Sequence, residues 1–216
     1  MNNIFLCKRI FAILWLFVFI SFNAFSDDSA DKLIKKIQNK YNSMQTVSIR
    51  FTQQVQFGVT KSEQTFKGKF LMKKGNKYLI ELEHQKIVTD GNSVWSINDL
   101  NQQVIIDKYR DDPNSFSPDK VLVSIPQNYN ASLLAKEKID ERDMSVVKLI
   151  PKDKKINYKW LKVWIGDDLI MKKVQLLDVS ENLTTYFVDE IKINQEIPDS
   201  QFQYKPESNL EIIDLR

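Results

Sequence analysis

The sequence predicts a mainly β domain of about ten or eleven antiparallel strands, with one N-terminal helix and a helical insertion in the middle of the chain. Apolar and polar residues alternate along most of the 216 residues. Turn signals recur at intervals of roughly eight to twelve residues, as in an antiparallel meander. After removal of a leader, the chain is long enough for one sizeable core, so we expect a single domain over residues 27–216.

Residues 29–44 form the predicted N-terminal helix. Their apolar side chains recur three and four positions apart with lysines between them, which is the pattern of an amphipathic helix. The period changes at Val47, and from there to Phe57 apolar residues alternate with polar ones. This second segment is therefore expected to be a strand with one face in water.

The next strands are expected to form hairpins. Alternation resumes over residues 66–72, breaks at the pair Gly75-Asn76, and returns over residues 78–82, so that pair marks a turn. In the stretch IVTDGNSVWSIND, the pair Asp90-Gly91 supplies the positive backbone angles that a tight turn needs. The further expected strands are residues 87–89, 93–97, 103–107, 145–150, 160–165, 170–179, 183–193 and 202–204.

A helical insertion interrupts the strands near the middle of the chain. Ser117-Pro118-Asp119 has an N-cap serine, a proline at the first helical position and an acid in the first turn. A second short helical piece is expected over residues 131–136. Such long insertions are often lids or binding elements, although a plain surface excursion is common.

The first 26 residues have the layout of a secretory signal peptide. The basic pair Lys8-Arg9 precedes an apolar run over residues 10–20, and small residues favour cleavage before Asp27. Cleavage removes Cys7, the only cysteine, and lowers the formal net charge from +3 to about +1. We therefore expect an exported, soluble protein, and its nearly neutral charge argues against nucleic acid as a partner.

The sequence contains no recognisable catalytic or metal-binding constellation. His84 is the only histidine, so the common zinc ligand sets cannot be assembled, and a Ser-His-Asp triad would depend on it. Asp90 is explained by its turn and has no chemical partner nearby. We expect no enzymatic activity, no catalytic residue, no metal and no cofactor. A secreted hydrolase with an unrecognised carboxylate site is the least favoured alternative.

Large apolar side chains on the expected strands exceed what one small helix can cover. A sheet of this length must curl, and a curled sheet with few helices against it can enclose a ligand cavity. A well-filled core would show the same pattern. The residues that we expect to line such a cavity are Phe51, Phe70, Tyr78, Ile80, Trp95 and Phe187.

Several spaced segments resemble the LolA family of periplasmic carriers of outer-membrane lipoproteins. They are FTQQ at 51–54, GKF at 68–70, IVTDGNSVWSIND at 87–99, SPDKVLV at 117–123 and the stretch beginning ENLTTYFVDEI at 181. The resemblance implies an incomplete, unclosed antiparallel β-barrel with a helical lid. Its apolar interior would receive the acyl chains of a lipoprotein, without a cofactor, in the periplasm.

The resemblance also implies partners. The cargo would be acylated lipoproteins, taken from an inner-membrane lipoprotein-releasing ABC transporter and handed to an outer-membrane receptor lipoprotein. We expect the carrier to be a monomer. Another exported module for a lipid or apolar ligand, built on the same curled sheet, is the main alternative.

A lid and a latch complete the expected site. The lid candidates are Val121, Leu122 and Ile125. In the family, the arginine of an Arg-Pro pair after the second strand bonds to the lid, whereas this chain has Lys74-Gly75 there. Lysine is a flexible point charge rather than a planar fork of donors, so a latch built on Lys74 should be less directional.

Overall fold

The computed structural model describes residues 27–110, 128–205 and 210–216. The expected signal peptide and the lid candidates Val121, Leu122 and Ile125 lie outside these ranges. No helix within them is long and apolar enough to cross a membrane. The elements are one helix, α1 (Asp27–Asn42), one short 3-10 helix, η1 (Asp199–Phe202), and strands β1 (Thr46–Gln56), β2 (Glu63–Lys73), β3 (Lys77–Leu82), β4 (Gln85–Asp90), β5 (Ser93–Asn98), β6 (Gln103–Lys108), β7 (Tyr129–Leu133), β8 (Glu137–Ile139), β9 (Arg142–Pro151), β10 (Tyr158–Ile165), β11 (Met171–Asp178), β12 (Leu183–Ile193) and β13 (Glu211–Asp214).

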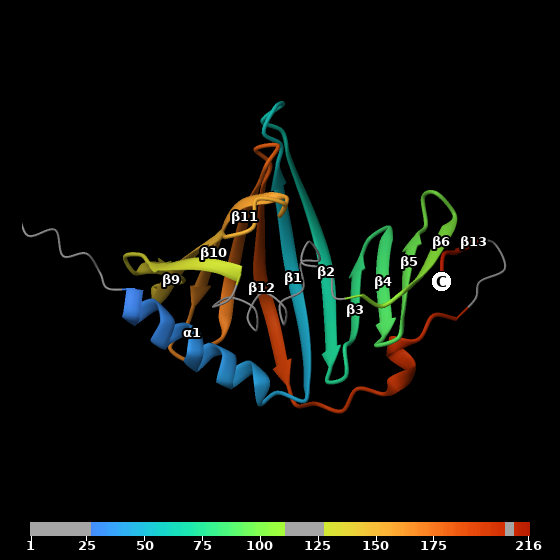
Figure 1. The fold of residues 1–216 in the computed structure, drawn as a ribbon, viewed down its shortest axis with the longest axis horizontal. Coiled ribbons are helices and arrows are strands. Elements are labelled where there is room, and N and C mark those ends of the chain that lie inside the picture. The colour runs from blue at the N-terminus through green and yellow to red at the C-terminus, as the bar shows by residue number, and fades with distance from the viewer. Residues whose placement is uncertain (1–26, 111–127, 206–209) are drawn as a thin grey trace, which may run out of the picture.

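The strands form one curled sheet that does not close. Its order is β13-β6-β5-β4-β3-β2-β1-β12-β11-β10-β9-β7, with β8 paired to β9 beside this path (Figure 1). The long strands β1, β2 and β12 lie in the middle because β1 pairs with both of the others. β13 and β7 are the two ends and do not pair with each other. The mainly β, unclosed antiparallel architecture is thus confirmed.

Two local predictions are wrong. Residues 131–136 were expected to be helical, but β7 covers their first half because Tyr129, Ala131 and Leu133 follow a strand's period of two and pair with β9. Residues 202–204 were expected to be a strand, but Phe202 is the fully buried last residue of η1, and the next two residues are not in a strand. The short strands β8 and β13 have no counterpart in the sequence prediction, and β13 pairs with β6 in parallel.

The sheet has two apolar faces. We call the face that α1 covers the inner face, and the opposite one the outer face. Ile34, Ile37 and Tyr41 of α1 pack into one core cluster with inner-face residues such as Val147 and Leu161. These helix residues recur at the spacing of one helical stripe, so the predicted amphipathic helix is confirmed.

The outer face has its own apolar cover over β2 to β6. There, the segment after β12 runs along the sheet through η1 (Figure 1). Phe202 and Ile197 of this segment pack against Leu71, Leu79 and Val88. The C-terminal segment therefore buries the outer face of β2 to β6, whereas the inner-face cluster includes side chains of β2 to β4 and leaves Ile105 of β6 exposed.

The two tight turns predicted from sequence are confirmed and lie against each other. The Asp90 carboxylate accepts hydrogen bonds from the backbone N–H groups of Asn92 (2.8 Å) and Ser93 (2.9 Å). Gly91 and Gly75 both have a backbone φ of +95°. A Cβ atom on Gly91 would come within 2.4 Å of the Gly75 carbonyl oxygen, whereas a Cβ on Gly75 would meet open space.

The pair of glycines therefore makes a matched experiment on stability. We expect Gly75→Ala to lower the free energy of unfolding by ~1–2 kcal/mol, the cost of a positive φ for a residue with a Cβ. Gly91→Ala should cost at least about 1 kcal/mol more, because its Cβ also displaces the neighbouring turn. Urea unfolding followed by circular dichroism measures both. Equal losses would show that the contact between the turns contributes nothing.

Candidate functional site

An apolar cavity of about 260 Å³ lies between α1 and the inner face. It is formed by the middle strands of the sheet and by the C-terminal end of the helix. All but one of its lining side chains are aliphatic, aromatic or Met. The lining residues are Tyr41, Ile49, Phe51, Gln53, Phe70, Ile80, Leu82, Ile87, Val163, Met171, Val174, Tyr186 and Val188.

The aromatic wall of the cavity depends on a glycine. Phe51 of β1 and Gly68 of β2 are directly opposite in the ladder. A Cβ at Gly68 would lie 2.3 Å from Cζ of Phe51, so only glycine leaves room for the ring to lie across β2. On its other side, the Phe51 ring meets Tyr186 edge to face, with centroids 5.8 Å apart. Gly68 of the GKF segment thus shapes the cavity.

Tyr41 fixes the end of α1 over the cavity. Its hydroxyl accepts a hydrogen bond from the backbone N–H of Met171 at the start of β11, at 3.3 Å. Burial raises the pKa of the Tyr41 hydroxyl to about 12. The side chain therefore stays neutral over the whole physiological range, and its single directional bond is made to the sheet.

The structure brings together only part of the predicted lining. Phe51, Phe70 and Ile80 line the cavity. Tyr78 is buried on the same face but belongs to a neighbouring cleft. Two expected residues, Trp95 and Phe187, do not line the cavity.

Both of these aromatic residues lie on the outer face. Trp95 is paired with Val88 of β4 and packs against the outer-face cluster. Phe187 alternates with Tyr186 and Val188, which line the cavity, so it points the other way. The strands bury apolar residues on both faces here, and alternation alone does not say which set faces α1.

The sequence interpretation missed several lining residues that the strand period could have indicated. Ile49 lies two residues before Phe51 on β1, and Val188 is the ladder partner of Phe51 on β12. Tyr41 belongs to the predicted helix of residues 29–44 but is not among the predicted lining residues. It lies at the cavity because α1 ends over this part of the sheet. That packing position is a tertiary feature, which no local sequence pattern indicates.

The predicted latch, Lys74, borders a second cleft of about 190 Å³ beside the cavity. Tyr41 and Tyr78 line this cleft as well. The backbone N–H of Lys74 donates to the carbonyl of Gln45 at 3.0 Å, and its side chain is exposed. Since the expected lid residues lie outside the described ranges, the latch stays a prediction.

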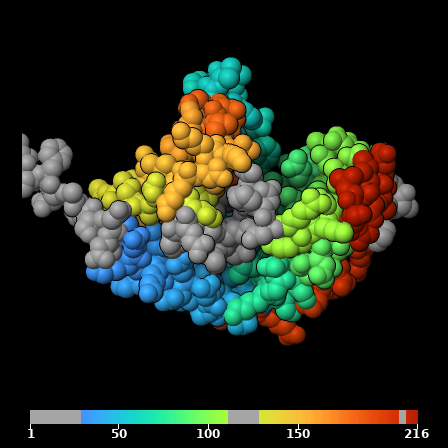
Figure 2. All heavy atoms as spheres, viewed as in Figure 1, coloured from blue at the N-terminus to red at the C-terminus, as the bar shows by residue number. Residues whose placement is uncertain are grey.

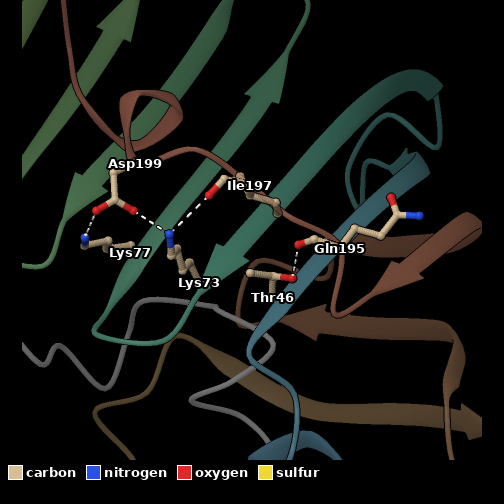
Figure 3. Close-up of polar contacts among 6 residues, drawn as sticks. All are labelled: Thr46, Lys73, Lys77, Gln195, Ile197 and Asp199. Atoms are coloured by element: carbon tan, nitrogen blue, oxygen red, sulfur yellow. Dashed lines mark hydrogen bonds and ion pairs between the residues drawn. The ribbon is translucent and has the colours of Figure 1, made fainter.

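The lysines on either side of this turn have a partner within the chain. Nζ of Lys73 lies 2.6 Å from one oxygen of Asp199, and Nζ of Lys77 lies 2.8 Å from the other (Figure 3). Lys73 also donates to the carbonyl of Ile197 at 3.2 Å. These contacts tie η1 and the C-terminal segment to the β2–β3 hairpin. The Thr46 hydroxyl holds the same segment by donating to the Gln195 carbonyl at 2.5 Å.

The sequence-predicted candidates for chemistry lie at turns of the described ranges. No group of three or more His, Cys, Asp or Glu side chains there could hold a metal ion. His84 is exposed at a turn, where Glu83 is its neighbour at 3.8 Å. Asp90 uses its carboxylate to cap the turn that follows it.

The fold and the cavity define a class of protein: an unclosed, curled β-sheet whose inner face and single long helix surround an apolar space. A sequence model of the family "Outer membrane lipoprotein carrier protein LolA" matches residues 42–205, which is most of the chain. The chain belongs to this family.

Known relatives are distant. An uncharacterized protein of Methanocaldococcus jannaschii is 24% identical over 181 residues, and the match covers 82% of this chain. This chain spans about half (52%) of the length of that protein. The outer-membrane lipoprotein carrier protein of Haemophilus influenzae (strain PittEE) is 26% identical over 184 residues, which cover 84% of this chain and 86% of that protein.

A solved structure has the same fold. The crystal structure of an uncharacterized conserved protein from Thermus thermophilus superimposes with a TM-score of 0.58 at 12% identity. The superposition covers 86% of this chain and 99% of that chain. At this identity the likeness concerns the fold alone.

The contacts of Asp199 predict a pH dependence. Hydrogen bonds from Lys73 and then Lys77 lower the pKa of the Asp199 carboxyl to about 2. Because the pKa is lower in the folded state than the ordinary value of about 4, the stabilisation is present above about pH 4 and is lost as the pH falls through about 2. Thermal unfolding should show Asp199→Asn less stable than wild type at pH 5 to 7, and the difference should vanish near pH 2.

The control for this experiment is Asp167→Asn, an exposed aspartate whose carboxylate has no partner among the described residues. Its unfolding temperature should follow that of wild type at every pH. A pH-independent difference for Asp199→Asn would contradict the ion pairs as its cause.

Proposed function

We propose that this protein is a periplasmic, non-enzymatic carrier that binds the acyl chains of lipoproteins released from the inner membrane. It transfers them to a receptor at the outer membrane. The observation that carries the proposal is the apolar cavity of about 260 Å³ under α1. Membership of the LolA family supports it, as does a relative named as an outer-membrane lipoprotein carrier protein.

The physical case rests on the cost of moving acyl chains through water. Each methylene group that leaves water contributes about 0.8 kcal/mol, so a lipoprotein with several acyl chains needs a covered apolar site to cross an aqueous compartment. Pockets for drug-sized ligands have volumes of about 300–1,000 Å³, and this cavity is slightly below that range. Acyl chains would therefore enter by separating α1 from the inner face.

A cover that closed the cavity when it is empty would also suit release. A permanently open inner face would expose a large apolar patch and favour aggregation. When the binding-competent state is a minority, the apparent affinity falls by the fraction in that state. The carrier then holds its cargo firmly enough for transit and weakly enough for delivery.

The cavity assignment is tested by a charge in its lining. We expect Ile80→Asp to lower retention of a triacylated lipoprotein at least tenfold, about 1.4 kcal/mol, because a buried carboxylate is costly in an apolar site. Ile212→Asp, on the exposed edge strand β13, is the matched control and should retain cargo like wild type. The measurement is co-purification of the lipoprotein after its release from inner-membrane vesicles that contain the releasing ABC transporter, with thermal unfolding as the check on folding.

Two results would count against the proposal. If folded Ile80→Asp and wild type retain cargo equally, Ile80 does not contact it. If wild type extracts no lipoprotein and its native preparation contains only free lipid by mass spectrometry, the protein is a lipid-binding module of another kind. Crosslinking to the transporter and to the outer-membrane receptor lipoprotein tests the two partners directly.

A further inference from the structure

The outer face of β9 to β12 carries an apolar row that belongs to none of the core clusters. Leu183, Leu177 and Trp160 are consecutive ladder neighbours on β12, β11 and β10. Ile150 continues the row on β9 and is 43% exposed. The other three are half-buried. Val179, in the turn that joins β11 to β12, is 56% exposed, and this turn belongs to the crest of the molecule (Figure 2).

Lysines lie beside this row and over the rings of Trp160 and the neighbouring Trp164. Lys148 and Lys162 are direct cross-strand partners on β9 and β10. Their ammonium groups lie 6.0 Å and 5.3 Å from the centre of the Trp160 ring. Lys173 lies 4.3 Å from the ring of Trp164 on the same face. None of the three forms an ion pair with a carboxylate of a described residue.

This arrangement runs against the usual stability preference of a sheet. Like charges directly opposite each other on one face of a β-ladder are destabilising. Other lysines on nearby elements do have acidic partners, as Lys172 has Asp168 and Lys159 has Glu181. This pair has the Trp160 ring as a neighbour but no acidic partner among the described residues, so it is suited to an anionic surface outside the chain.

We propose that this face, defined by Trp160, Leu177, Leu183, Ile150, Lys148 and Lys162, binds the surface of a bilayer that contains anionic phospholipids. Tryptophan favours the boundary between headgroups and acyl chains, and lysines pack their stems on apolar surface while their ammonium groups reach the phosphates. A shallow apolar row with lysines around it suits a soft lipid surface. A protein partner would instead need close shape complementarity.

The proposal goes beyond cargo binding and uses the opposite face of the sheet. A molecule docked in this way keeps its inner face, α1 and the cavity away from the bilayer contact itself. Binding to lipid needs neither cargo nor transporter, so it can be measured even if the carrier function fails.

The test is flotation of the chain from Asp27 onward, which contains every described element. The vesicles are phosphatidylcholine alone or phosphatidylcholine with about 30% phosphatidylglycerol, because the attraction requires an anionic surface. Wild type should float only with the anionic vesicles, and added salt should release it. Lys148→Gln with Lys162→Gln should bind about thirtyfold more weakly, since each lysine near such a surface contributes ~1 kcal/mol.

Lys35→Gln with Lys36→Gln removes the same charge from the exposed side of α1 and should bind like wild type. The Lys148 and Lys162 double variant should unfold at the same or a higher temperature than wild type, because a repulsive pair is removed. The proposal is overturned if wild type ignores anionic vesicles, or if the two double variants lose binding equally. Retention on polyglutamate beads without any vesicle binding would also overturn it, in favour of an acidic protein partner.

Discussion

The structure depends on a mismatch between the length of its sheet and the size of its cover. The path of strands from β13 to β7 extends about 50 Å along the surface at the usual strand spacing. The 16 residues of α1 reach only about 24 Å. One helix cannot cover such a face if the face stays flat. The sheet therefore curls toward the helix, and the space left between them, about 260 Å³, is lined by apolar side chains from the middle strands.

The apolar side chains of the outer face are covered differently in two parts of the sheet. Over β2 to β6, the chain returns after β12 and covers the face itself, with Phe202 fully buried and Asp199 held by Lys73 and Lys77. Over β9 and β10, a smaller cluster of Met144, Val146 and Trp164 is covered by Leu134 and Ile139. Around Trp160, lysine ammonium groups lie over a half-buried ring instead, so this part of the outer face is left amphipathic toward its surroundings. This division follows from the position of β12 in the middle of the sheet, since the C-terminal segment leaves from there toward only one end.

The sequence predicted what depends on local periodicity and failed where a tertiary neighbour decides. The apolar–polar alternation from Val47 onward and the Asp90-Gly91 turn correctly predicted strands. The apolar stripe that includes Ile34 and Ile37 correctly predicted α1. Trp95 and Phe187 were placed on the wrong face because both faces of their strands are apolar, and only the pairing with covered neighbours separates them. β13 was not predicted because it has only four residues and is formed by pairing with β6. These two strands lie far apart in the sequence, so no local pattern indicates the pairing.

The way in which α1 is held decides how the inner face can open. Its one directional contact at the cavity is the hydrogen bond between Tyr41 and Met171, and such a bond contributes only about 1 kcal/mol net. Its packing on the inner face is apolar, through Ile34 and Ile37, and such contact contributes roughly 25 cal/mol per Å² removed from water and has no preferred direction. Under the proposed function, an acyl chain that took the place of the helix would again bury the apolar inner face. Separating α1 from the sheet costs the free energy of their apolar contact. A long apolar ligand would offset this cost by burying the same surface, whereas a polar ligand or water would not. For the proposed carrier, selectivity for acyl chains would arise from the cover that they replace, without a charged recognition group among the cavity-lining residues.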